Sequence, residues 1–156
     1  MGNHTPTPLS QAWLDALQAG GYRITRPLQV IVEIRANSAR ALGPVNIYDL
    51  ARKEYPKTGL VTVYRALEKL EATGLVQRVH QADGCHAYLR AANRHEHIFL
   101  CRLGGQGVYF SGDTLGALII RVDGQSGLTN QERWLQFPGL RATQQCEKSP
   151  SFFPCC

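Results

Sequence analysis

The chain has 156 residues, of which 44% are hydrophobic and 19% are charged, and its net charge is +5 at pH 7. This composition excludes a disordered chain, and the lack of any run of about 18 apolar residues argues against a membrane-spanning helix. Residues 1–11 also lack the basic stretch and apolar run of a secretory signal, so we expect a cytoplasmic protein.

Two helices are predicted before residue 40. Ser10 is the expected N-cap of the first helix, which Gly20 and Gly21 end. Thr25 is the expected cap of the second helix, and Pro27 fits its first turn. The apolar residues of each helix share one side: Trp13, Leu14 and Leu17 in the first, and Leu28, Ile31, Val32 and Ile34 in the second.

A short third helix is predicted over residues 45–55, and a longer fourth helix over 59–74 is the clearest periodic segment of the chain. The residues expected to face inward are Val45, Ile47, Leu50 and Ala51 in the third helix, and Leu60, Val63, Leu67 and Leu70 in the fourth. Two strands follow at 75–80 and 85–90, joined by an Asp83-Gly84 turn. Four helices and a hairpin predict a winged helix-turn-helix.

The second half is predicted to be a small α/β domain, so the fold class is α+β. Strands are expected at 97–101, 107–110 and 133–137. Residues 114–122 are apolar but contain β-branched residues and a glycine, so helix and strand both remain open there. We divide the chain into a DNA-binding domain at 1–90, a dimerisation domain at 91–140 and a tail at 141–156.

Charge is distributed unevenly along the chain. Residues 1–80 hold ten Lys and Arg against six Asp and Glu, a net of +4, whereas residues 81–156 hold seven against six, a net of +1. Because Lys and Arg gain affinity by releasing counterions from phosphates, a basic N-terminal half is consistent with a nucleic-acid partner. A solvated basic surface would have the same charge.

The fourth helix has the features of a helix that reads DNA. On a wheel of about 100° per residue, its outer face carries Thr62, Arg65, Lys69 and Thr73, with Ala66 and Ala72 between them. Glu68 and Glu71 are expected towards the flank with Tyr64, which leaves the outer face without an acid. Small residues permit close approach, and a basic residue can contact guanine edges or phosphates. An ordinary amphipathic surface helix is the alternative.

Three arginines outside this helix are further candidates for DNA contacts. Arg23 and Arg26, at the junction of the first two helices, could bind phosphate beside the fourth helix. Arg78 on the hairpin could contact the DNA backbone or minor groove as a wing residue. For all three, exposure to solvent is the alternative.

Two segments together resemble the N-terminal domain of the ferric uptake regulator (Fur) family. They are GYRITRPLQVIVEI at 21–34 and TGLVTVYRALEKLEATGLVQRVHQADG at 58–84. The similarity covers roughly residues 20–110 and extends weakly through 133–140. It implies that Tyr64 and Arg65 lie on the recognition helix. It also implies a three-stranded dimerisation sheet, a homodimer on pseudo-palindromic double-stranded DNA, and metal-responsive repression of metal-uptake or stress genes.

The resemblance further implies a divalent metal, zinc or iron, held between the two domains by histidines and carboxylates. The corresponding stretch contains His95 and His97, which are two residues apart and would therefore face the same side of a strand. This spacing suits two imidazole ligands of one ion, with Glu96 adjacent. A surface histidine pair at the start of a strand is the alternative.

The chain departs from the family where thiolates and carboxylates are expected. The first C-x-x-C pair is reduced to Cys101, so a thiolate site would need Cys146, Cys155 or Cys156 in an arrangement that the family does not have. Tyr109 replaces a family carboxylate. One reading is a rebuilt metal site that uses His95 and His97, with Glu96 or Cys85 as a further ligand. The other is a diverged regulator whose DNA binding is indifferent to chelators.

Two other classes of protein fit the sequence less well than a DNA-binding regulator. An enzyme is disfavoured because Cys85 and His86 are adjacent on a strand and point opposite ways, and because no hydrolase, zincin or phosphate-loop motif is present. A winged helix that binds only protein is the stronger alternative, and it predicts no salt-dependent affinity for DNA.

Overall fold

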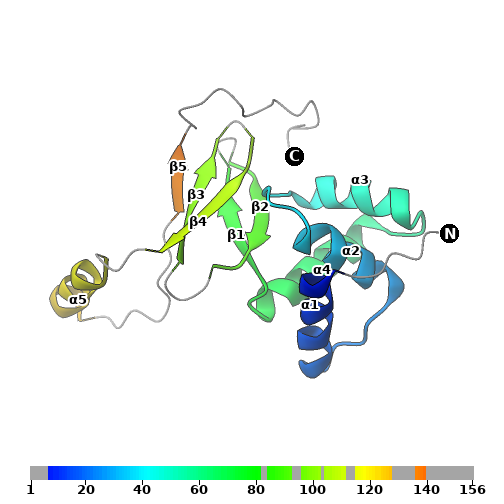
Figure 1. Cartoon of the computed structure of the whole chain (residues 1–156), viewed down its shortest axis with the longest axis horizontal. Coiled ribbons are helices and arrows are strands. Elements are labelled where there is room, and N and C mark those ends of the chain that lie inside the picture. Colours follow the sequence, from blue (N-terminus) through cyan, green and yellow to red (C-terminus); the bar gives the residue numbers. More distant parts are fainter. Residues whose placement is uncertain are drawn as a thin grey trace.

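The computed structural model describes residues 7–81, 84–92, 96–102, 104–111, 115–127 and 136–139. Helices α1 to α4 gather at one end of the molecule, the β1–β2 hairpin follows, and a second sheet lies beyond it (Figure 1). The elements are α1 (Pro8–Ala19), α2 (Arg26–Ala36), α3 (Pro44–Glu54), α4 (Leu60–Ala72), β1 (Val76–His80), β2 (His86–Arg90), β3 (Glu96–Cys101), β4 (Gly107–Ser111), α5 (Leu115–Ser126) and β5 (Gln136–Gly139). Within these ranges, no helix has the length and apolar character needed to cross a bilayer.

The helix starts differ in detail from those expected. Thr7, and not Ser10, caps α1: its hydroxyl accepts a hydrogen bond from the Ser10 amide at 3.3 Å, while Ser10 itself is buried inside the first turn. Thr25 occupies the cap position of α2, but its side chain makes no capping hydrogen bond. At the other end of the bundle, Gly74 ends α4 with a φ of 68°, as its position after the periodic segment predicted.

The four helices bury one core, and three residues expected inside it are exposed. Val45 and Leu50 on α3 and Leu60 at the start of α4 all face solvent. Helix α3 packs mainly against α2 and α4, and its buried residues are Pro44, Ile47 and Ala51. The core is formed by Trp13, Leu14, Leu17, Leu28, Val30, Ile31, Val32, Ile47, Ala51, Val63, Ala66, Leu67, Leu70, Val76 and Tyr88.

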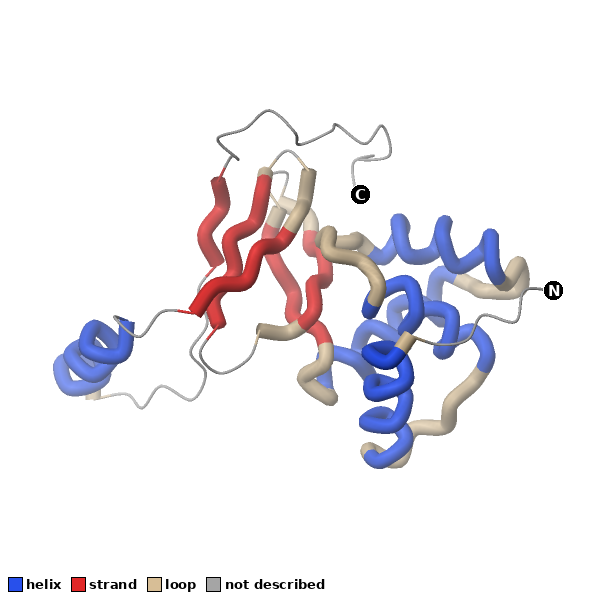
Figure 2. Tube along the Cα trace, viewed as in Figure 1, coloured by secondary structure: helices blue, strands red, loops and turns tan. Residues whose placement is uncertain are grey.

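The strands form two separate sheets (Figure 2). β1 and β2 make the antiparallel hairpin of the winged helix, in which His80 pairs with His86. β3 lies between β4, its antiparallel neighbour, and β5, its parallel neighbour, so the expected three-stranded sheet is present. The segment left open between helix and strand is the helix α5, which stands apart from both sheets at the far end of the molecule.

A second, smaller core joins the hairpin to the three-stranded sheet. Its members are Ala41, Val79, Ala87, Leu89, Ile98 and Leu100. The segment between α2 and α3 crosses the same junction, because the Ala41 amide donates to the Gly105 carbonyl at 2.7 Å and the Gly107 amide donates to the Ala39 carbonyl at 3.1 Å. The winged helix and the second sheet therefore share packed side chains and backbone hydrogen bonds. The division at residue 90 stays a prediction.

We expect Gly107→Ala to destabilise this junction. An added Cβ would lie 2.9 Å from Leu89 Cδ1, and Leu89 is itself buried and has little room to move. Overpacking of this kind costs about 1–3 kcal/mol in the free energy of unfolding, which chemical denaturation measures. The control is Gly116→Ala in α5, where an added Cβ meets no atom within 4 Å and alanine favours the helix. Equal stability of Gly107→Ala and the wild type would contradict the packing described.

Candidate DNA-binding surface and metal ligands

The exposed face of α4 is apolar and basic over its first two turns. Val61 is 64% exposed and Tyr64 is 46% exposed, and Arg65 beside them also faces solvent. Thr62 is half-buried at the edge of this face. Val61 was not among the predicted DNA contacts, although the helical wheel places it between Arg65 and the flank. Its methyl groups suit contact with a thymine methyl group.

Two expectations for α4 need correction. Ala66 is buried with Val63, Leu67 and Leu70, so it does not lie on the outer face. Glu68 is exposed one turn after Arg65, so the outer face does contain an acid. Because recognition helices contact base edges with their N-terminal residues, the acid-free part is the relevant one.

Basic residues border this face on the side of the α1–α2 loop. The ammonium group of Lys69 lies 5.6 Å from the centre of the Tyr22 ring, which places the loop beside the C-terminal half of α4. Arg23 in that loop and Arg26 at the start of α2 are both exposed. Arg23 follows Tyr22 directly in this loop, and the contacts of Arg23 and Arg26 with phosphate stay predictions.

Arg78 is held by other residues of the winged helix. Its guanidinium makes an ion pair with Glu71 at 2.9 Å and lies 5.7 Å from the centre of the Tyr88 ring. The hydrogen bond from Arg78 to Glu71 is the main cause that raises the pKa of the guanidinium. Arg78 therefore shares its charge with a carboxylate of α4, and a phosphate would have to compete with that carboxylate.

The predicted metal ligands on β3 do not converge on one point. Glu96 and His97 are neighbours on the strand, so their side chains point to opposite faces of the sheet. The Glu96 carboxylate faces the hairpin, where it lies 3.6 Å from the Arg90 guanidinium. The His97 ring is 4% exposed and packs 5.6 Å from the Phe110 ring on the other face. Glu96 and His97 thus do not fit a single ion.

The remaining predicted ligands do not complete a site in the described chain. Cys101 is buried on the same face as His97, but four residues of strand separate them by about 13 Å. His95, Cys146, Cys155 and Cys156 lie outside the described residues. Within the described residues, no three histidine, cysteine or acidic side chains come together as ligands. His97 keeps a buried Nδ1 without a hydrogen-bond partner in this part of the chain.

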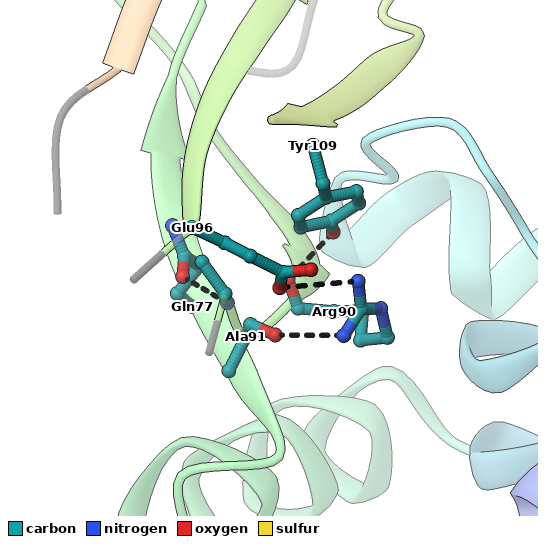
Figure 3. A network of polar contacts seen from close by, with 6 residues as sticks. Gln77, Arg90, Ala91, Glu96 and Tyr109 are labelled. Atoms are coloured by element: carbon teal, nitrogen blue, oxygen red, sulfur yellow. Dashed lines mark hydrogen bonds and ion pairs between the residues drawn. The ribbon is translucent and has the colours of Figure 1, made fainter. Parts of the chain in front are cut away.

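A polar network occupies the junction between the two sheets (Figure 3). Arg90 at the end of β2 pairs with Glu96 on β3, and its guanidinium lies 4.1 Å from the centre of the Tyr109 ring on β4. The Tyr109 hydroxyl donates to the Arg90 carbonyl at 2.6 Å. Sequence reasoning placed Tyr109 where the family has a carboxylate, but it did not identify Arg90. Nothing in the local pattern indicates a pairing between two sheets.

The sequence matches the model of the Ferric uptake regulator family over residues 19–137, more than half of the chain. The chain belongs to the ferric uptake regulator family. Members of this family are metal-responsive regulators of transcription that bind DNA, and this chain is accordingly a DNA-binding transcriptional regulator. The resemblance read from residues 21–34 and 58–84 is thereby confirmed.

Individual relatives agree with this membership. The Ferric uptake regulation protein of Yersinia pestis is 27% identical over 138 residues, which cover 87% of this chain and 93% of that protein. The Helicobacter pylori ferric uptake regulator Fur superposes with a TM-score of 0.66 at 17% identity, over 94% of this chain and 99% of that one. A zinc uptake regulator complexed with zinc and DNA superposes with a TM-score of 0.66 at 19% identity, over 87% of this chain and 94% of that one. These likenesses establish the fold, as expected from the sequence.

Proposed function

We propose that this regulator reads double-stranded DNA with the first two turns of α4. The observation that carries the proposal is the exposure of Val61, Tyr64 and Arg65 on one face of a helix whose opposite face is fully buried. An apolar group, a phenol and a guanidinium at a helix start match what base edges in a major groove offer. Arg23 and Arg26 supply phosphate contacts beside it.

We further propose that the regulator acts as a homodimer on a pseudo-palindromic operator. The face of the second sheet that points away from the hairpin exposes Val108, Phe110 and Phe137, and α5 exposes Ile120 at 68%. Apolar surface of this kind, remote from α4, is suited to a second copy of the chain. We place the protein in the cytoplasm, as a regulator and not an enzyme.

The direct test is selection of genomic DNA fragments by the purified full chain. We expect enrichment of fragments that share one inverted-repeat motif, with an affinity that falls steeply as salt rises. Recovery of fragments with no common motif at every salt concentration would refute sequence-specific binding. Retention of protein partners without any DNA affinity would favour the protein-interaction winged helix instead.

A second candidate is the same regulator without a metal response, and the pairing of Glu96 with Arg90 favours it. In this case the inverted-repeat motif is recovered equally well in EDTA. For a metal response, His97, with its buried Nδ1, and His95 remain the proposed ligands of a zinc or iron ion. Loss of the motif in EDTA and its return with one of these metals would support that response.

We expect Glu71→Gln to strengthen DNA binding modestly. The change removes a carboxylate beside α4 and releases Arg78 for contact with phosphate. An exposed ion pair is worth about 0.2–1 kcal/mol, so the affinity should rise by up to roughly fivefold. The affinity is measured by titrating a selected fragment with Glu71→Gln. The control variant is Glu54→Gln, on the exposed end of α3. Weaker binding by Glu71→Gln would show that Arg78 needs Glu71 to be positioned.

A further inference from the structure

The positive group at the junction between the two sheets is an arginine side chain of the protein itself. Arg90 ends β2 of the winged helix, and its guanidinium lies between the Glu96 carboxylate of β3 and the Tyr109 ring of β4 (Figure 3). The side chain also donates to the Ala91 carbonyl at 3.3 Å, which holds the guanidinium close to its own backbone. A single positive group thus contacts groups from both sides of the junction.

Tyr109 contacts Arg90 twice, once through its ring and once through its hydroxyl. Its ring stacks on the Arg90 guanidinium, while its hydroxyl reaches the Arg90 carbonyl at 2.6 Å. Burial raises the pKa of the Tyr109 phenol, so the hydroxyl remains a donor at neutral pH. The Arg90–Glu96 distance of 3.6 Å is long, and an isolated pair of this kind contributes little. The strength of the contact therefore comes from the stacking and the hydrogen bond acting together.

Two other contacts hold the same junction in place. The Gln136 side chain of β5 bonds the backbone of His80 on β1, donating to its carbonyl at 2.9 Å. The segment 38–42 is fixed by the buried Arg35, whose Nη1 and Nη2 donate to the carbonyls of Arg40 at 2.8 Å and Ser38 at 2.7 Å. That segment bonds both the hairpin and the β3–β4 turn.

We propose that Arg90, Glu96 and Tyr109 form a latch that holds the winged helix against the second sheet, in place of an ion bridging the two parts. The proposal rests on the proposed DNA-binding function, because the latch matters to the regulator by fixing the position of α4. The Glu96 carboxylate, which could have bound a divalent ion at this junction, faces the Arg90 guanidinium at 3.6 Å instead. The position of the winged helix is therefore insensitive to chelators.

The latch has a measurable consequence for DNA binding. If releasing it lets the two parts separate, only a fraction of molecules presents both copies of α4 at the required spacing. The apparent affinity falls by that same fraction. A latch residue acts through position alone, so the recognised motif should stay the same while the affinity falls.

Hydrogen exchange of the full chain, without DNA, tests the latch directly. The amides of Ala41 and Gly107 donate across the junction, so they report its opening. We expect unchanged exchange in the wild type with EDTA, and roughly tenfold faster exchange at these amides in Arg90→Gln. Exchange within α4 should stay at the wild-type rate, which shows that the winged helix remains folded. The control is Arg102→Gln, which changes an exposed arginine that directly follows β3.

Tyr109→Phe removes only the hydroxyl and should give a smaller increase in exchange at the same amides. Lasting protection of Ala41 and Gly107 in both variants would overturn the latch, and so would faster exchange of the wild type in EDTA. DNA selection by the wild type is a separate readout. If the wild type binds no specific DNA, the proposed function fails, whereas the exchange data still decide whether the latch exists.

Discussion

Replacing Arg65 by alanine is expected to reduce the affinity of the full chain for its selected DNA at least about thirtyfold. Each good contact between a side chain and a base edge discriminates by about 1–3 kcal/mol, and a dimer loses two such contacts. Arg65 is exposed on the first two turns of α4, beside Val61 and Tyr64. The measurement is a titration of one selected fragment, with a scrambled fragment beside it.

The variants around Arg65 separate reading of bases from attraction to phosphate. Arg65→Ala should lose discrimination between the selected and scrambled fragments. Arg23→Ala and Arg26→Ala should weaken both fragments alike, and each should lower the slope of the salt dependence by about two units, because a dimer loses two phosphate contacts. Arg102→Ala, in the turn that follows β3, controls for the loss of one positive charge. Unchanged specific binding by Arg65→Ala would show that α4 is not the reading helix.

Replacing Arg35 by alanine is expected to lower the free energy of unfolding by about 3 kcal/mol. Arg35 is fully buried, and its two terminal nitrogens satisfy the carbonyls of Ser38 and Arg40. Burial lowers the pKa of this guanidinium to about 10, so it is still charged at neutral pH. Alanine would leave a cavity and remove one donor from each of the half-buried carbonyls of Ser38 and Arg40, although the Arg40 carbonyl also accepts from the Ser38 hydroxyl at 3.1 Å. The relief of the buried charge offsets only part of that loss.

A second variant distinguishes the lost hydrogen bonds from the lost volume. Arg35→Met keeps most of the side-chain volume and removes the charge, so we expect it to lose about half as much stability as Arg35→Ala. Chemical denaturation monitored by circular dichroism compares both with the wild type. If Arg35→Ala is as stable as the wild type, segment 38–42 is not held by Arg35.

The winged helix could be predicted from the sequence because local signals determine it. The spacing of Val63, Leu67 and Leu70 identifies α4, and Gly74 ends it with the left-handed conformation that glycine favours. The hairpin follows from two β-rich runs around a turn. Errors arose where burial depends on neighbouring elements. Leu60 is exposed because it opens α4 beyond the packed bundle, and Ala66 is buried because its small side chain lies against that bundle.

The junction and the metal ligands could not be predicted in the same way. The contact of Arg90 with Glu96 depends on how two sheets stack, which no short-range pattern encodes. The alternation of β3 was predictable, and it already separates Glu96 from His97. The sequence could not decide between helix and strand for α5, because its β-branched residues and its glycine give no clear preference. The structure shows a helix there. The DNA contacts, His95 and the domain boundary stay predictions.

The most direct test of the account is to map which part of the chain touches DNA bases. A photoreactive residue at Val61, on the exposed face of α4, is compared with one at Ile120 on α5, at the opposite end of the molecule. Each of the two labelled variants is bound to a selected DNA fragment and irradiated. We predict cross-links from position 61 to major-groove bases in both halves of the inverted repeat, and none from position 120. Specific binding without cross-links from position 61 would contradict reading of DNA by α4.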